Sequence, residues 1–178
     1  MALTDRTFAT NARREQLPMI EITPFAPQHS GGVISVVLPI QQVEFEIPIT
    51  LEAQPDLLDI QGAYRQGKGN FWVALDDQSV VGTVGLLDIS NHQAALRKMF
   101  VKATHRGAEH GVAKRLLDTL FAWCRAHGVH EVYLGTTAKF LAAHRFYEKN
   151  GFREVSHEDL PKSFPVMLVD TKFYYRTS

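Results

Sequence analysis

The segment Arg106–Lys114, which reads Arg-Gly-Ala-Glu-His-Gly-Val-Ala-Lys, combines residues that suit an anion-binding loop. It contains two glycines, has basic residues at both ends, and opens directly into a segment with helical periodicity. The apolar residues of that segment recur every four positions, at Val112, Leu116, Leu120 and Cys124. The first N–H groups of a helix have no partner inside the helix, and its dipole places partial positive charge there. The segment therefore predicts a site for a phosphate or pyrophosphate.

The spacing of the glycines argues against two common nucleotide-binding loops. Gly107 is not followed by Gly-Lys-Ser/Thr at the distance of a P-loop, and the Gly-x-Gly-x-x-Gly dinucleotide pattern is absent. Two glycines before a helix also occur in ordinary tight turns. Taken alone, the loop leaves an anion site and a structural turn both open.

The composition argues against several classes of protein. The 178 residues suit one domain with a sizeable core, and nineteen basic residues balance nineteen acidic ones. The basic surplus of a nucleic-acid binder is missing, so no nucleic-acid partner is expected. The eight histidines show no paired metal-ligand spacing, and no metal is expected. Cys124, the single cysteine, lies in the apolar repeat and is interpreted as a buried thiol, not a nucleophile.

The N-terminal residues 1–18 are polar and lack the apolar core of a secretory signal, and no apolar run reaches the length of a membrane span. We therefore expect a cytoplasmic protein without a membrane partner, in keeping with its single cysteine. Residues 1–18 are interpreted as a flexible extension, and residues 19–178 as a single domain.

Periodicity and turn residues predict the elements of the first half. Residues 19–23 read as a strand, and helical stretches follow at about 27–42 and 51–66, the second interrupted near Pro55. After a turn at residues 67–70, two strands at 71–75 and 79–89 form a hairpin.

The second half alternates strands with helices. A strand at 96–101 precedes a helix at 110–127 that stops at Gly128, and a strand at 129–135 precedes a helix that ends at Lys149. Thr136 or Thr137 is expected to cap this second helix. The last strands are predicted at 152–155 and about 166–175. A meander followed by strand, helix, strand, helix and strands is typical of a mixed α/β sheet.

Two motifs occur in a characteristic order along this pattern. The first is a strand ending Met99-Phe100-Val101 followed by the loop 106–113, and the second reads Ala143-His-Arg-Phe-Tyr147-Glu-Lys-Asn-Gly151-Phe152. They resemble the Leu-x-Val strand end with Arg-Gly-x-Gly-x-Gly/Ala, and the Ala-x-x-Leu-Tyr-x-x-x-Gly-Phe motif, of the GCN5-related N-acetyltransferase (GNAT) superfamily. The resemblance covers about residues 71–175. It implies a GNAT-like acyl-CoA N-acyltransferase fold, in which a twisted mixed sheet splays between its two central parallel strands, here 96–101 and 132–135, with helices on both faces.

Two positions depart from the family pattern. Ala113 lies seven residues after Arg106, where the family has five, so the loop carries two extra residues within 108–110. Glu109 would repel a pyrophosphate and is expected to point into solvent. Phe140 stands where many members carry an asparagine that contacts the cofactor, so that contact would fall to Thr136, Thr137 or a backbone group.

The resemblance implies acetyl-CoA as co-substrate, with its pantetheine arm between the two central strands and its pyrophosphate on the loop. A backbone N–H near Phe100 or Val101 would stabilise the oxyanion. The implied cofactor-binding residues are Met99, Phe100, Val101, Arg106, Gly107, His110, Gly111, Val112, Ala113 and Lys114.

Catalysis by direct transfer needs an acid and a base. The leaving thiol has an ordinary pKa of about ~8.5, and the motif match makes Tyr147 the candidate general acid, the alternative being a buried packing aromatic. A lysine-like amine has a pKa of about ~10.4 and must lose a proton. The candidate bases are Glu44, Glu46, Asp88 and His92, each of which also suits a solvated surface position.

The sequence thus predicts an N-acetyltransferase that moves an acetyl group from acetyl-CoA to a primary amine through a ternary complex. The alternative is a catalytically silent acyl-CoA-binding or protein-interaction module on the same fold. The amine, whether of a small molecule or a peptide, stays open, and its pocket is expected from residues 27–66, the loop 161–165 and the last strand. An exposed final strand would allow a homodimer.

Overall fold

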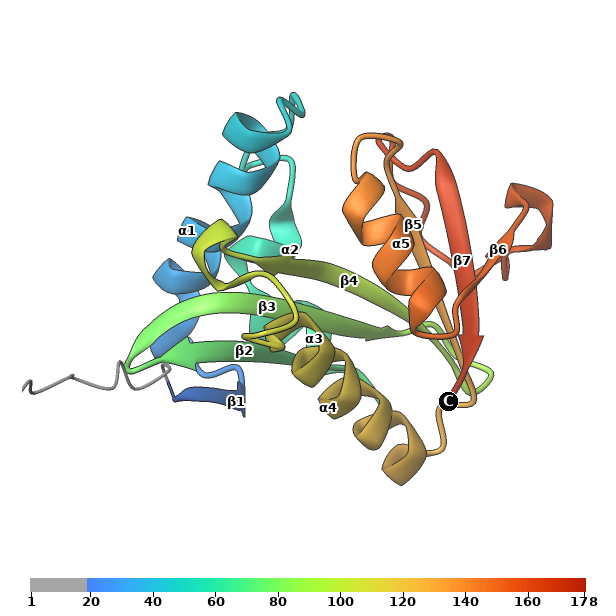
Figure 1. Cartoon of the computed structure of the whole chain (residues 1–178). Helices are drawn as coiled ribbons and strands as arrows, with labels where there is room; N and C mark the ends of the chain where they lie inside the picture. Colours follow the sequence, from blue (N-terminus) through green and yellow to red (C-terminus); the bar gives the residue numbers. More distant parts are fainter. Residues whose placement is uncertain (1–18) are drawn as a thin grey trace, which may run out of the picture.

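The computed structural model describes residues 19–178, and the predicted extension 1–18 lies outside the described residues. One seven-stranded sheet with the strand order β1-β2-β3-β4-β5-β7-β6 runs through this part of the chain (Figure 1). The mixed α/β prediction is confirmed. The strands are β1 (Ile20–Pro24), β2 (Asn70–Asp76), β3 (Ser79–Asp88), β4 (Gln93–Val101), β5 (Glu131–Thr136), β6 (Arg153–Val155) and β7 (Lys172–Thr177).

The sheet consists of two antiparallel groups joined by one parallel pair. Strands β1 to β4 form an antiparallel meander, which includes the predicted β2–β3 hairpin. On the other side, β7 lies between β5 and β6 and pairs antiparallel with both. The parallel pair β4–β5 is in register only from Gln93–Ala95 to Glu131–Tyr133, and beyond these residues the two strands diverge.

Helices cover both faces of the sheet (Figure 1). On one face, α4 (Val112–His127) and α5 (Leu141–Lys149) share a core with β2 to β5. On the other face, the helices between β1 and β2 pack on β2 and β3. These are α1 (Ser30–Pro39), which starts from the 3₁₀ turn η1 (Pro27–His29) and continues into the π turn η2 (Ile40–Glu44), and the short α2 (Pro55–Leu58) and α3 (Ile60–Tyr64).

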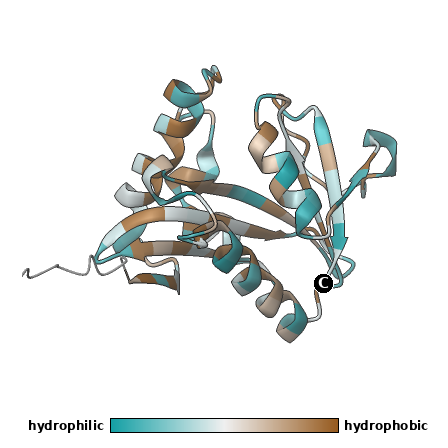
Figure 2. Ribbon diagram, viewed as in Figure 1, coloured by the Kyte–Doolittle hydropathy of each residue, from teal (hydrophilic) through white to brown (hydrophobic). Residues whose placement is uncertain are grey.

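The long helix α4 shows how the sequence pattern produces this packing. Its apolar repeat, Val112, Leu116, Leu120 and Cys124, is buried against the sheet, and Gly128 ends it in the left-handed conformation. Figure 2 shows the hydrophobic residues concentrated along the central strands, with hydrophilic residues on the outer side of the helix. The expected burial of Cys124 is confirmed, and burial raises the pKa of its thiol to about 12.

Helix boundaries differ from the sequence predictions in two places. Pro55 begins α2, where a proline needs no N–H partner, and the break falls at Asp59, whose carboxylate accepts from the Gly62 N–H at 2.8 Å. The Thr136/Thr137 cap is wrong, because Thr136 still pairs in β5 and α5 begins only at Leu141.

The prediction for the final strand is wrong at its start and in its exposure. β7 begins at Lys172, because Met167–Asp170 closes a turn in which the Asp170 N–H donates to the Met167 carbonyl at 3.0 Å. β7 is also interior to the sheet, between β5 and β6, so it is no free edge for a second subunit. A homodimer stays a prediction without this support.

Candidate active site

A cavity of about 380 Å³ opens where β4 and β5 diverge. Its walls come from segments far apart in the chain: the start of η2 and the segment that follows it, the outer half of β4, the glycine loop, the end of β5, α5, and the loop before β7. Of the predicted site residues, those that line it are Met99, Phe100, Val101, Arg106, Gly107, Ala113 and Tyr147. The structure therefore brings both sequence motifs to one cavity.

The cavity wall on β4 contains a β-bulge that was not predicted from the sequence. The register with β3 shifts between Thr83 and Gly85, and Lys98 takes a left-handed backbone conformation with φ of 52°. The Thr83 hydroxyl donates to the Lys98 carbonyl at 2.6 Å and holds the bulge in place. A bulge re-aims the residues that follow it. Here these residues are Met99–Val101, which run along the cavity without a partner on β5 among the described residues.

The glycine loop and the first turn of α4 present backbone donors beside this cavity. Gly111 has a φ of 61° as the N-cap, and its N–H donates to the Gly107 carbonyl at 3.1 Å, which closes the lengthened loop into one turn. Within residues 19–178, no acceptor meets the N–H groups of Val112, Ala113 or Lys114. A Cβ added to Gly107 would meet nothing within 4 Å, so the loop faces open space. This arrangement fits the pyrophosphate of an acyl-CoA.

Arg106 holds the loop against its surroundings. Its guanidinium donates to both carboxylate oxygens of Glu44, one at 2.8 Å, and its Nε donates to the Val101 carbonyl at 2.7 Å. The hydrogen bonds from Arg106 lower the pKa of Glu44. Glu44 is thus a partner of the loop, placed at its base by η2.

The remaining loop residues lie around the turn. The Glu109 side chain is 77% exposed, as expected, and sits 3.5 Å from His110 Nε2. The Lys114 ammonium pairs with Asp118 one turn further along α4 and is half-exposed. The Val112 side chain is buried in the core, so only its backbone N–H is available to a ligand.

Tyr147 reaches the cavity from α5. The residue is 6% exposed, and its ring packs edge-on against Phe152, 5.4 Å between centroids. Burial raises the pKa of its hydroxyl well above the usual range, so the group keeps its proton at any physiological pH. No hydrogen bond joins this hydroxyl to another described residue, which leaves it free to donate into the cavity.

The other candidate bases lie elsewhere. Asp88 caps a turn, accepting from the Lys68 and Ser90 N–H groups at 2.8 Å. His92 stacks on His130 at the opposite end of β4, and the Glu46 side chain is exposed. None of the three lines the cavity.

Asp170 is the functional candidate that sequence reasoning missed, and it is the only carboxylate among the described residues that line the cavity. Its Oδ2 accepts from the Met167 N–H at 2.9 Å, and a Cβ added to Gly135 on β5 would lie 2.4 Å from that oxygen. Burial raises the pKa of Asp170, against the lowering effect of the Met167 N–H and of the Arg97 and Lys98 charges. No motif marks Asp170, and the stretch around it was predicted as a strand.

Phe140, which replaces the family asparagine, forms part of the apolar wall. Its ring meets Phe45 edge-on at 4.5 Å between centroids and Phe100 at 6.0 Å. The hydroxyl of Thr137 is engaged by the Lys139 N–H at 3.1 Å. The side of the cavity next to Phe140 is therefore hydrophobic.

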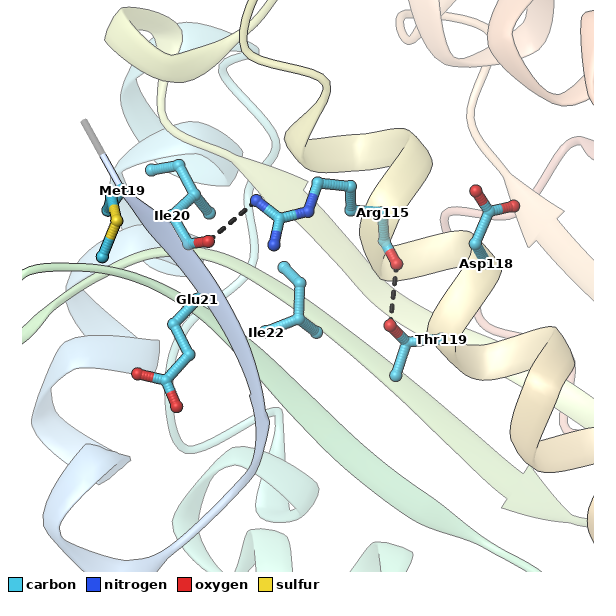
Figure 3. Close-up of a pocket in the computed structure, with 7 residues that line it drawn as sticks. All are labelled: Met19, Ile20, Glu21, Ile22, Arg115, Asp118 and Thr119. Carbon is cyan, nitrogen blue, oxygen red and sulfur yellow. Dashed lines mark hydrogen bonds between the residues drawn. The ribbon is translucent and has the colours of Figure 1, made fainter. Parts of the chain in front are cut away.

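A second hollow of about 860 Å³ lies between the edge strand β1 and α4 (Figure 3). There the Arg115 guanidinium donates to the Ile20 carbonyl at 2.8 Å, and Thr119 donates to the Arg115 carbonyl at 2.9 Å. No predicted site residue lines it. Its polar groups serve to attach β1 to the helix.

Residues 19–178 contain neither a membrane-spanning helix nor a cluster of metal-ligating side chains. No helix in this range combines the length and apolarity that a membrane crossing requires. No group of three or more His, Cys, Asp or Glu side chains there could hold a metal ion.

Comparison with known proteins matches residues 36–152 to the acetyltransferase (GNAT) family. The chain belongs to this family. An acetyltransferase of the GNAT family from Staphylococcus aureus Mu50 has 41% sequence identity and a TM-score of 0.85, over 89% of this chain and 98% of that one. The predicted family and the splayed GNAT fold are confirmed.

Two animal GNAT relatives match a shorter stretch. A probable N-acetyltransferase family 8 member 5 from Mus musculus is 37% identical over 105 residues, 56% of this chain and 45% of its own. The N-acetylaspartate synthetase of Homo sapiens is 37% identical over 106 residues, 58% of this chain and 34% of its own. The chain therefore spans less than half the length of these curated relatives.

Proposed function

We propose that this GNAT protein transfers an acetyl group from acetyl-CoA to the primary amine of a small-molecule acceptor. The observation that carries this proposal is the divergence of β4 and β5 beside a glycine loop whose helix N–H groups are unpaired within residues 19–178. The names of the relatives, N-acetyltransferases and N-acetylaspartate synthetases, support the reaction and a small acceptor.

The cofactor side would hold acetyl-CoA, which supplies an activated thioester. The backbone of Met99–Val101 would pair with the pantetheine arm, since this edge of β4 has no strand beside it among the described residues. The N–H groups of Gly107, His110 and Val112–Lys114 would surround the pyrophosphate, whereas the Gly111 N–H closes the loop. Arg106 would contribute by fixing the loop, because Glu44 and Val101 already engage its guanidinium.

The catalytic groups that we propose are side chains and backbone groups lining the cavity. Asp170 accepts a proton from the acceptor amine, whose nitrogen bonds to the thioester carbonyl carbon. A backbone N–H near Phe100 or Val101 donates to the carbonyl oxygen as negative charge develops there. As the carbon–sulfur bond breaks, Tyr147 donates its proton to the leaving sulfur. The raised pKa of Asp170 suits a base that works near neutral pH.

The test is a thiol-release assay with acetyl-CoA and a panel of primary amines, alongside calorimetric titration with CoA. We expect CoA binding and thiol release with at least one small amine, with Tyr147→Phe as the catalytic control. Binding without release from any amine or peptide would show the silent acyl-CoA-binding module instead. Absence of CoA binding would overturn the proposed function.

A further inference from the structure

Three cationic side chains line the cavity, and they differ in their partners. Arg106 is paired with Glu44, and the Lys98 ammonium donates to Gln54 Oε1 at 2.6 Å and lies 3.5 Å from Asp56. Arg97 has no carboxylate within 4.0 Å in residues 19–178. The one hydrogen bond of its side chain within residues 19–178 runs from Nη2 to the Met167 sulfur, at 3.3 Å. Arg97 is therefore a half-buried cation that faces the cavity without an anion.

The Lys98 ammonium belongs to a polar network whose members bond to one another. Gln54 exchanges two hydrogen bonds with Gln41, at 3.0 and 3.1 Å, and Asp56 accepts from the Tyr64 hydroxyl at 2.6 Å. Lys98 is thus satisfied by α2 and its neighbours. The available positive charge belongs to Arg97 alone among these three.

Arg97 and Asp170 are attached to the same turn. The Met167 N–H donates to the Asp170 carboxylate, and the Met167 sulfur meets the Arg97 guanidinium. Both groups line the same cavity, and the Arg97 charge acts to lower the pKa of Asp170, yet no nitrogen–oxygen distance of 4.0 Å or less joins them in an ion pair. A cation and an anion held near each other without pairing form a site for a molecule that carries both charges.

We propose that the acceptor is a small amino acid, with its carboxylate bound by Arg97 and its amino group directed at Asp170. This inference rests on the proposed acetyl transfer and names its acceptor class. The guanidinium offers parallel donors that match the two oxygens of a carboxylate, and such charge-assisted pairs are strong and directional. Arg97 lies just beyond Ala95, the last β4 residue in register with β5, at the point where the strands begin to diverge. The bound amine would therefore meet the thioester at the head of the cavity.

The experiment compares acceptors with and without a carboxylate. L-Aspartate, L-glutamate, L-alanine and β-alanine are each assayed against their fully amidated counterparts, with wild type, Arg97→Gln, Arg97→Lys and the exposed control Arg153→Gln. We expect wild type to prefer at least one acid over its amide by tenfold or more in kcat/KM. Arg97→Gln should remove this preference by raising KM for the acid about 10- to 100-fold more than KM for its amide, with CoA affinity unchanged.

Arg97→Lys keeps the positive charge but lacks the two parallel N–H donors of the guanidinium. It should therefore retain part of the preference for acids over amides. Arg153→Gln should match wild type. Thermal unfolding of each variant identifies loss of the fold, and Arg97→Lys serves as the test if Arg97→Gln is unfolded.

Amides that react as well as acids, or an Arg97→Gln defect equal for both, would overturn the inference and leave acetyl transfer intact. No thiol release from any acceptor would overturn the proposed activity and this inference together, while CoA titration reports separately on the cofactor site.

Discussion

The proposed cofactor side and the proposed acceptor side of the cavity are built in different ways. The cofactor side is one continuous stretch of chain, β4, the glycine loop and α4, and it offers mainly backbone groups. The acceptor side combines β4, η2 and the loop before β7, and it offers side chains, Arg97 and Asp170 above all. Binding a ligand through backbone groups requires one stretch of chain in a particular conformation. Binding through these side chains requires segments far apart in the sequence to lie close together. The difference explains why one side carries a motif and the other does not.

The largest effect is expected where both sides meet, at the Tyr147 hydroxyl. Tyr147→Phe should lower kcat by about 10²–10³-fold, because the leaving sulfur loses its proton donor. The affinity for CoA should stay unchanged in calorimetry. Tyr175→Phe, on β7 and outside the cavity, is the matched control. Equal rates for wild type and Tyr147→Phe would remove Tyr147 from the mechanism.

The acceptor side should respond to Asp170→Asn with a fall in rate of about 100-fold at neutral pH. The wild-type rate should fall on acidification at a higher pH than an ordinary aspartate would cause, because burial raises the pKa of Asp170. Glu158→Gln, an exposed acid in the preceding loop, controls for charge. A pH–rate profile identical in wild type and Asp170→Asn would rule Asp170 out as the base.

Asp170→Asn, which should lower the rate, should raise the stability of the fold. A carboxyl with a raised folded-state pKa stabilises the fold below its unfolded pKa, and this contribution is lost as pH rises through the folded value. Above the folded-state pKa the wild type lacks this contribution, and Asp170→Asn should unfold at a higher temperature there. A gain of about 1 kcal/mol corresponds to about 2–4 °C. The difference should disappear in acid, which calorimetric scans at two pH values would check.

The cofactor side should respond to charge placed on the loop, not to side-chain truncation. Gly111→Asp and Gly111→Asn both tolerate the left-handed conformation, so they differ only in a negative charge beside the α4 N-terminus. The Asp variant should bind CoA about tenfold more weakly than the Asn variant, a difference of about 1.4 kcal/mol. Calorimetric titration at one salt concentration measures it. Matching affinities would place the pyrophosphate elsewhere.

The smallest effect is expected at the contact between Gly135 on β5 and the loop before β7. An alanine Cβ at Gly135 would collide with the Asp170 carboxylate, so Gly135→Ala should lower kcat/KM for the acceptor by about fivefold and spare CoA binding. Gly31→Ala on α1, where a Cβ meets nothing within 4 Å, is the control. An unchanged kcat/KM would mean that the position of Asp170 is not critical.

Sequence reasoning succeeded where structure is local. The structure confirms the apolar repeat of α4, its end at Gly128 and the β2–β3 hairpin. Each of these features is determined by residues close together in the sequence. The loop Arg106–Ala113 lies at the predicted place for the same reason. Its guanidinium partner Glu44 is 62 residues away in sequence and could not be paired from spacing.

The parts that failed depend on tertiary contacts. The bulge at Lys98 has a positive φ at a lysine, whereas such a conformation is normally marked in a sequence by a glycine. The Thr83 hydroxyl on the neighbouring strand β3 stabilises it. Asp170 became a cavity residue only because Gly135 leaves room for its carboxylate. The predicted helix cap at Thr136 was wrong because Thr136 belongs to β5, where it pairs with Lys172 of β7.

The short parallel contact between β4 and β5 has a thermodynamic consequence. Three register pairs join the meander to the β5-β7-β6 group, so a pantetheine arm lying along Met99–Val101 would supply the missing strand. A ligand that binds only the folded protein stabilises it by about 2.7 kcal/mol at a hundred times its Kd. The unfolding temperature of the protein would then rise with the concentration of acetyl-CoA around it.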